Sequence, residues 1–236
     1  MNYRPLAKIG MLAICTAAAG SVPSFSQTVL STGHADVGIA YELGAWNLHV
    51  HNHATEEEYS PSEAILQLNP ESARPIPASP SFSFLGSAGT TFYVLPQVEE
   101  ANLIFLGLGA EEVLAGDFAG DNMVLTLKSV TGPGNFSLYS VDGLGNPTVF
   151  MNSGNGISDG TDFVNVPAES HNHYNWAFTM PGTYTVGFEA TGTHSTDGPV
   201  ASGLVNYRFE VIPEPSTWAL LAVGSVLVFG LQKRRK

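Results

Sequence analysis

The sequence predicts an all-β domain, an antiparallel β-sandwich of the immunoglobulin-like or jelly-roll-like kind. Three observations support this prediction. Several segments alternate apolar and polar residues, turn-forming residues separate them at short spacing, and the 236 residues include 25 glycines and 15 prolines. Hydrophobic residues make up 44% of the chain and aromatic residues 10%, which is too much for a disordered chain and sufficient for a sizeable core.

Each predicted strand places its apolar side chains on one face. In the first, Val37, Ile39 and Tyr41 share a face, and in one of the later strands Trp176 and Phe178 do so. In chain order the predicted strands cover residues 37–41, 46–50, 123–127, 174–178, 184–188 and 205–211. Turn signals such as Gly-Pro-Gly at 132–134, Asp-Gly at 142–143 and Pro-Gly at 181–182 lie between them. Short strands joined in this way favour antiparallel pairing.

Residues 1–26 have the pattern of a secretory signal peptide. Arg4 and Lys8 form its basic start, and the apolar stretch that follows predicts a signal helix. The expected cleavage site lies between Ser26 and Gln27. Because Cys15 is the only cysteine, a chain cut at this site has no disulfide and no cysteine-bound metal. The predicted domain then covers residues 27–212.

The C-terminal residues 213–236 contain three parts in a fixed order. Pro213, Glu214 and Pro215 come first, an apolar run to residue 231 follows, and Lys-Arg-Arg-Lys ends the chain. A helix over 218–231 would span only about 21 Å of a bilayer core of about 30 Å, which suits a transient anchor with its basic end in the cytoplasm. A simple tail anchor is the alternative interpretation.

This tail resembles the PEP-CTERM sorting signal. The resemblance implies that the general secretion machinery exports the chain and that a membrane protease of the exosortase type recognises and removes the tail. The protein would be tethered to the membrane by its C-terminal transmembrane helix before processing. After processing it would be secreted to the cell surface, the outer membrane or the extracellular matrix.

Charge excludes one class of partner. Residues 27–212 contain three basic side chains, Arg74, Lys128 and Arg208, against 20 of the 21 acidic ones, which leaves this part of the chain at −17. A nucleic-acid-binding surface requires clustered basic residues. We therefore expect no nucleic-acid partner.

Histidine placement points to a metal. An H-x-H-x-H tract begins at residue 49, and an H-x-H pair occupies 171 and 173. Alternate residues of a strand share a face about 6.5–7 Å apart, so two imidazoles can converge on one ion. The predicted ligands of Zn²⁺, or of another divalent transition metal, are His34, His49, His51, His171 and His173, with Asp36 as an additional ligand. His53 and His51 are candidates for solvent-facing positions, and exposed polar strand faces without a specific metal site are the alternative.

The sequence contains none of the catalytic motifs H-E-x-x-H, the P-loop or G-x-G-x-x-G. The first hypothesis is therefore a non-enzymatic surface protein that binds a metal. The second is a structural or matrix-interaction protein. The third is a metal-dependent extracellular hydrolase, for which Glu42 or Glu169 would have to serve as the base.

Residues 33–41, 44–51, 106–112 and 132–139 resemble the choice-of-anchor M domain, and residues 171–184 resemble the repeat of related surface-anchored proteins. The resemblance covers roughly residues 30–212. Some relatives are associated with metal ABC transporters, so it implies a metal-related surface role with a metal uptake system as partner. It implies no catalytic residue. This chain has a single domain where those relatives have several repeats.

Overall fold

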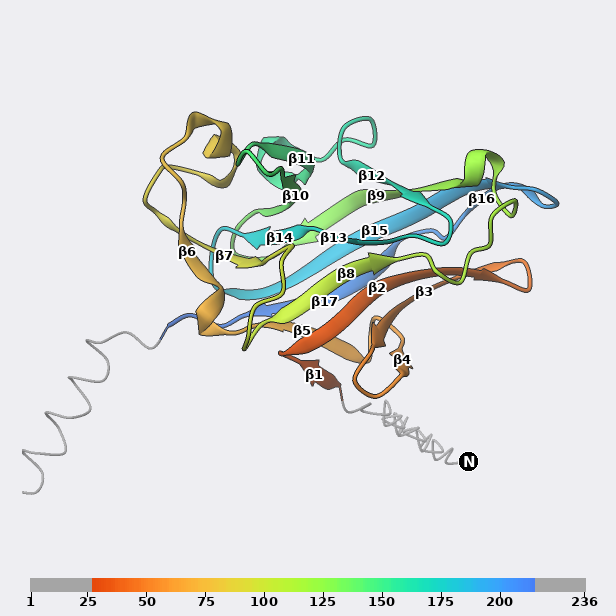
Figure 1. The fold of residues 1–236 in the computed structure, drawn as a ribbon, viewed down its shortest axis with the longest axis horizontal. Helices are drawn as coiled ribbons and strands as arrows, with labels where there is room; N and C mark the ends of the chain where they lie inside the picture. Colours follow the sequence, from red (N-terminus) through yellow and green to blue (C-terminus); the bar gives the residue numbers. More distant parts are fainter. Residues whose placement is uncertain (1–26, 215–236) are drawn as a thin grey trace, which may run out of the picture.

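The computed structural model describes residues 27–214, and β-strands dominate this part of the chain (Figure 1). Its helical pieces are four short 3-10 turns, η1 to η4. No helix among these residues is long and apolar enough to cross a membrane. The predicted signal helix, Ser26 and the tail from Pro215 onward lie outside the described residues.

Three sheets build the domain. The seven-stranded sheet consists of β1 (Thr28–Leu30), β5 (Ala64–Leu68), β17 (Val205–Val211), β15 (Gly182–His194), β9 (Asn122–Thr131) and β12 (Phe163–Pro167), with β16 (Gly198–Ala201) paired to β15. The β10 sheet consists of β11 (Pro147–Asn152), β10 (Phe136–Val141), β14 (Asn175–Phe178), β7 (Thr91–Leu95) and β6 (Ala73–Pro75). The β2 sheet consists of β13 (His171–His173), β8 (Ile104–Gly109), β2 (Gly33–Glu42), β3 (Ala45–Asn52) and β4 (Glu57–Tyr59).

The sandwich-like all-β prediction is confirmed, but the expectation of purely antiparallel sheets is wrong. Three neighbouring pairs are parallel: β1 with β5, β5 with β17, and β2 with β8. Parallel neighbours cannot be joined by a tight turn and require a long crossover connection. Here the chain forms β3 to β7 before it returns to place β8 beside β2.

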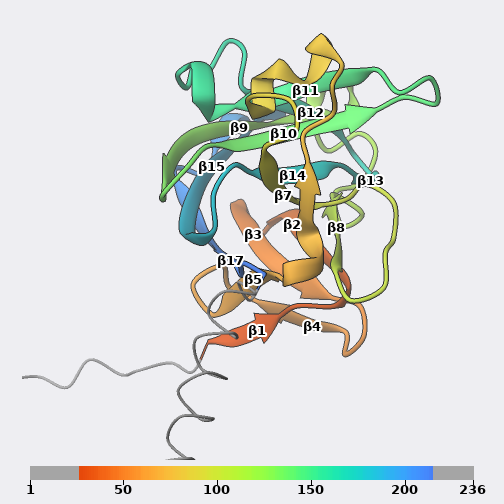
Figure 2. The same cartoon turned by 90° about the vertical axis from the view of Figure 1, so that its left-hand side faces the viewer.

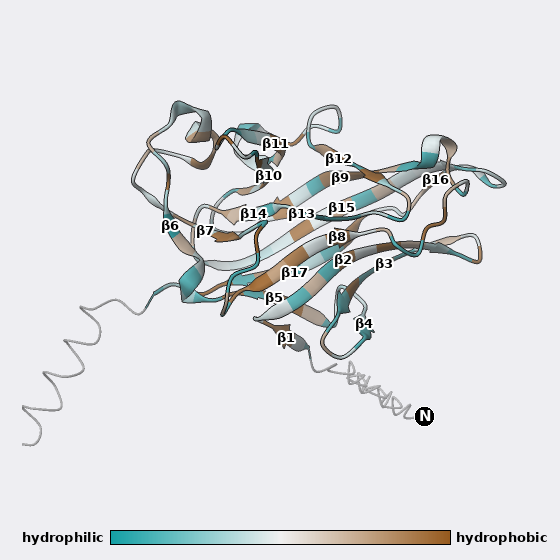
Figure 3. Ribbon diagram, in the orientation of Figure 1, coloured by the Kyte–Doolittle hydropathy of each residue, from teal (hydrophilic) through white to brown (hydrophobic). Residues whose placement is uncertain are grey.

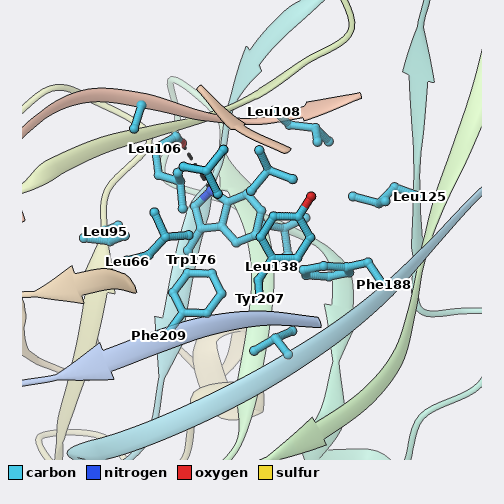
Figure 4. Packing of buried hydrophobic residues seen from close by; sticks show 14 of the residues in the cluster. Leu66, Leu95, Leu106, Leu108, Leu125, Leu138, Trp176, Phe188, Tyr207 and Phe209 are labelled. Carbon is cyan, nitrogen blue, oxygen red and sulfur yellow. Dashed lines mark hydrogen bonds between the residues drawn. The ribbon is translucent and has the colours of Figure 1, made fainter. Parts of the chain in front are cut away.

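Residues from all three sheets share one hydrophobic core. Bands of apolar and polar residues follow one another along the long strands (Figure 3), as the predicted alternation requires. Trp176 lies at the centre of the cluster drawn in Figure 4, fully buried, and its indole N–H donates to the Leu106 carbonyl oxygen at 3.2 Å. This hydrogen bond ties the β10 sheet to the β2 sheet inside the core.

One segment belongs to two sheets in succession. Residues His171–His173 pair with β8 as β13, and after Tyr174 the chain continues as β14, which pairs with β10 and β7 (Figure 2). The same segment therefore supplies polar residues to the β2 sheet and core residues to the β10 sheet.

The faces of β2 and β3 agree with the predicted alternation. Val37, Ile39, Leu48 and Val50 are buried in the core. The intervening residues point to the other side, which we call the outer face of the β2 sheet. Across this face the register aligns β3, β2, β8 and β13 side by side.

Candidate metal centre

Four side chains converge on the outer face of the β2 sheet. One ligand atom from each lies within 4.8 Å of all the others. We call this set the four-ligand cluster, and its members are His34, Asp36, His53 and His171. His34 and Asp36 come from β2, His53 directly follows β3, and His171 begins β13.

Backbone register explains the convergence. Asp36 pairs with Gly107 of β8 on one side, and Gly107 pairs with His173 of β13 on the other. His171 pairs with Gly109 in the next row. Glycines on the central strand leave the outer face open, so side chains from β2 and β13 can reach across β8 toward each other.

The distances match a tetrahedral ion. Asp36 Oδ1 lies 3.3 Å from His34 Nε2 and 3.1 Å from His171 Nε2, and these two nitrogens lie 3.1 Å apart. Ligands bound at 2.0–2.1 Å in a tetrahedral zinc site are separated by about 3.3 Å. The three atoms therefore form a triangle of the size that one face of such a site requires. His53 Nε2 approaches the other oxygen of Asp36, Oδ2, at 2.6 Å.

The buried carboxylate of Asp36 fits a cation. Asp36 is 1% exposed, and its Oδ1 makes no hydrogen bond. His53 pairs with the other oxygen, Oδ2, so only Oδ1 of this buried carboxylate is unsatisfied, and such an oxygen is unfavourable unless a positive charge compensates it. Within residues 27–214 the basic side chains are engaged elsewhere: Arg74 with Glu100, Lys128 with Asp159 and Glu189, and Arg208 with Gln27. A bound metal ion would supply the missing charge.

Gly107 forms the floor of the cluster. A β-carbon built at this position would lie 2.1 Å from Asp36 Oδ1 and 2.8 Å from His171 Nε2. Such contacts are far closer than van der Waals packing allows. Glycine at this position is therefore what lets the carboxylate and the imidazole occupy their places.

Glu111, which follows β8, orients one of the imidazoles. Its Oε1 lies 3.1 Å from His171 Nδ1, so Nδ1–H can donate to the carboxylate while Nε2 faces Asp36. A carboxylate that holds the far nitrogen of a histidine in this way fixes the tautomer and the ring orientation of a metal ligand. Glu111 was not among the ligands predicted from the sequence.

Two histidines of this face, His34 and His173, lie in ring stacks and have a lowered pKa. The His34 and His53 rings stack with centroids 4.0 Å apart, and His173 stacks on Phe105 at 3.5 Å. Burial lowers the pKa of His34, against the opposing effect of Asp36. Burial also lowers the pKa of His173 to about 4, with further contributions from the two neighbouring imidazoles. Neutral imidazole is the form that ligates a metal.

Only some of the metal ligands predicted from the sequence belong to the four-ligand cluster. His34, Asp36 and His171 lie in the four-ligand cluster. His173 lies beside it, with its buried Nδ1 unpaired. His49 and His51 lie outside it. His49 Nε2 is 3.9 Å from Glu112, and His51 Nε2 is 3.6 Å from Glu56.

His53, and not His49 or His51 as predicted from the sequence, is the histidine of the H-x-H-x-H tract that joins the cluster. β3 ends at Asn52, and the chain then turns. The backbone N–H of His53 donates to the His34 carbonyl oxygen at 3.2 Å, which brings the His53 side chain over β2. The strand end, and not the spacing of the histidines, decides which of the three joins the cluster.

The described end of the chain lies apart from the cluster. Pro213 and Glu214 border an open hollow of about 310 Å³ together with Arg74 and Tyr93. At the other end, Gln27 accepts a hydrogen bond from Arg208. Gln27 is thus held against β17, whereas Pro213 and Glu214 are exposed.

Comparison with known proteins identifies the tail. A family described as the PEP-CTERM protein-sorting motif matches residues 211–236. No curated protein and no solved structure matches the chain. The motif implies a secreted protein that is sorted to the cell surface and recognised by exosortase-type machinery. The comparisons give no support for the choice-of-anchor M resemblance.

Proposed function

We propose that this chain is a non-enzymatic, surface-sorted protein that binds a divalent transition metal through His34, Asp36, His53 and His171. In this proposal residues 1–26 direct export, 27–212 form the metal-binding domain, and 213–236 direct sorting. The observation that carries it is the convergence of three imidazole nitrogens on the buried Asp36 carboxylate, with nitrogen–oxygen distances of 2.6–3.3 Å.

Zn²⁺ is the preferred ion. Three imidazoles and one carboxylate form a nitrogen-rich set that suits Zn²⁺, with Cu²⁺ and Ni²⁺ as competitors. Four protein ligands also complete a tetrahedral shell, whereas catalytic zinc sites keep one position open for water. This favours metal capture or structural binding over hydrolysis. Glu42 and Glu169 are exposed and outside the cluster, so neither supports the hydrolase alternative.

A metal uptake system at the cell surface is the partner that this role would serve. That part of the proposal rests on the family resemblance of the sequence. If the chain has no specific metal site, the alternative function is that of an acidic structural or matrix protein. Its negative charge would attract cations without selecting among them.

The test is metal analysis combined with calorimetric titration of Zn²⁺ into the purified full-length chain at pH 7.5. We expect one tightly bound ion, which His171→Gln and Asp36→Asn abolish. Glu111→Gln should weaken binding by about 10–100-fold, because it releases the orientation of His171.

His194→Gln is the control, since it removes an imidazole that lies beside Asp197 and belongs to no group of potential ligands among the described residues. Equal affinity in the wild type, His171→Gln and Asp36→Asn would refute the proposed site. Absence of stoichiometric binding would leave the structural alternative.

A further inference from the structure

A second group of potential ligands lies on the same outer face. It consists of His49 on β3, Glu58 on β4 and Glu112 after β8, whose ligand atoms lie within 4.8 Å of one another. None of these residues belongs to the four-ligand cluster.

The position of His49 is specifically accommodated by the fold. The residue is 4% exposed, and its ring lies directly over Gly38 of the neighbouring strand. A β-carbon at position 38 would approach His49 Nε2 to 2.1 Å, so only glycine leaves room for the ring. This repeats the arrangement of Gly107 beneath the first cluster.

The free nitrogen of His49 faces carboxylates. Nδ1 lies 3.4 Å from the Asn47 carbonyl oxygen, an acceptor that favours the proton on Nδ1. Nε2 then keeps its lone pair, makes no hydrogen bond to protein, and lies 3.9 Å from Glu112 Oε1. A backbone carbonyl that fixes the far nitrogen is the common support of a histidine that ligates a metal.

A small cavity joins the two groups. It measures about 20 Å³, which is room for about one water-sized occupant. Its lining includes His49 and Glu112 from the second group, Asp36 from the first cluster, and Glu111. Among residues 27–214, the three basic side chains make their polar contacts elsewhere, so no Lys or Arg neutralises these acids.

We propose that His49, Glu58 and Glu112 form a second divalent-cation site beside the first, so that the domain holds two cations. One imidazole and two carboxylates are mixed nitrogen and oxygen donors, which suit Mn²⁺ as well as Zn²⁺. Both carboxylates are exposed, so water completes the coordination shell and affinity is lower than at the first cluster. The site uses different residues from the proposed function and can fail or succeed separately.

The test loads the full-length chain with one equivalent of Zn²⁺ and then titrates Mn²⁺, with free Mn²⁺ followed by electron paramagnetic resonance. The wild type should bind one Mn²⁺ per chain. His49→Gln and Glu112→Gln should each weaken that binding by about tenfold or more. Glu112 is exposed, so its variant tests the site even if the change at buried His49 disturbs folding.

Glu57→Gln is the control for the electrostatic field. It removes the same charge from the same acidic tract, but its carboxylate contacts Tyr59 and Thr55 instead of the group. Binding that is absent in the wild type, unchanged in Glu112→Gln, or weakened equally by Glu57→Gln would overturn the proposal. A failure of the first cluster would be seen separately, because Zn²⁺ affinity would then be the same in the wild type and in His171→Gln. In that case Mn²⁺ can be titrated into the chain without Zn²⁺.

Discussion

Replacement of Gly107 by alanine should disable the four-ligand cluster with a single methyl group. The new β-carbon would lie 2.1 Å from Asp36 Oδ1, whereas ordinary contact begins at 3.4 Å. The carboxylate must therefore retreat by about 1.3 Å, or the strand must move by that amount. Metal ligands must keep their distances within about 0.2 Å, so this displacement removes Asp36 from the coordination shell.

The expected loss exceeds that of a change outside the coordination shell. Loss of an outer partner costs about 10–100-fold in metal affinity, so displacement of a ligand should cost at least about 100-fold, or about 2.7 kcal/mol. Calorimetric titration with Zn²⁺, or competition with a chromophoric chelator, measures this difference. Urea denaturation of the metal-free variant shows whether the domain still folds.

Gly109→Ala is the matched control. It makes the same chemical change two residues further along β8 on the same face, but its β-carbon would lie 3.6 Å from Asp36 Oδ2, an ordinary contact. We expect nearly unchanged affinity in this variant. Wild-type affinity in Gly107→Ala, or an equal loss in both variants, would refute the reasoning.

Three further predictions concern stability and sorting. Burial holds the pKa of His173 near 4, below the unfolded value of about 6.5, so the unfolded chain binds more protons in this range. The free energy of unfolding of the metal-free protein should therefore fall as pH drops from about 6.5 to 4, and His173→Asn should flatten this dependence in urea titrations. Trp176→Phe should lower the free energy of unfolding by about 1–3 kcal/mol, because it leaves the buried Leu106 carbonyl oxygen without its donor; an unchanged urea midpoint would contradict this. Alanine at positions 213–215 should leave an unprocessed, cell-associated chain on immunoblots, whereas normal release would show that these residues do not direct sorting.

Local patterns predicted much of the fold. Alternation correctly placed Val37, Leu48 and Trp176 in the core, because burial of one strand face depends on neighbouring residues in the chain. The parallel pairing of β2 with β8 could not be predicted in this way. It depends on which distant segments meet, and alternation is the same whichever partner a strand takes.

The cluster was predictable only in part for the same reason. His34, Asp36 and His171 followed from strand faces, whereas His53 depends on the point where β3 ends. Glu111 carries no local signal, since its role arises only when β13 lies beside β8 and presents His171 to it. The sequence likewise does not indicate that Gly107 and Gly38 belong to ligand sites. Their role is recognised only when the structure shows which side chains lie over them.

His34 and His171 are separated by 137 positions in the chain, yet their Nε2 atoms lie 3.1 Å apart. An ion held by both would act as a cross-link that closes a loop spanning most of the domain. A disulfide that closes a loop of about 100 residues stabilises a protein by about 4.7 kcal/mol in the chain-entropy account. Residues 27–214 contain no cysteine and therefore no disulfide bond. In an oxidising compartment the metal would provide the long-range cross-link that other exported domains obtain from disulfide bonds.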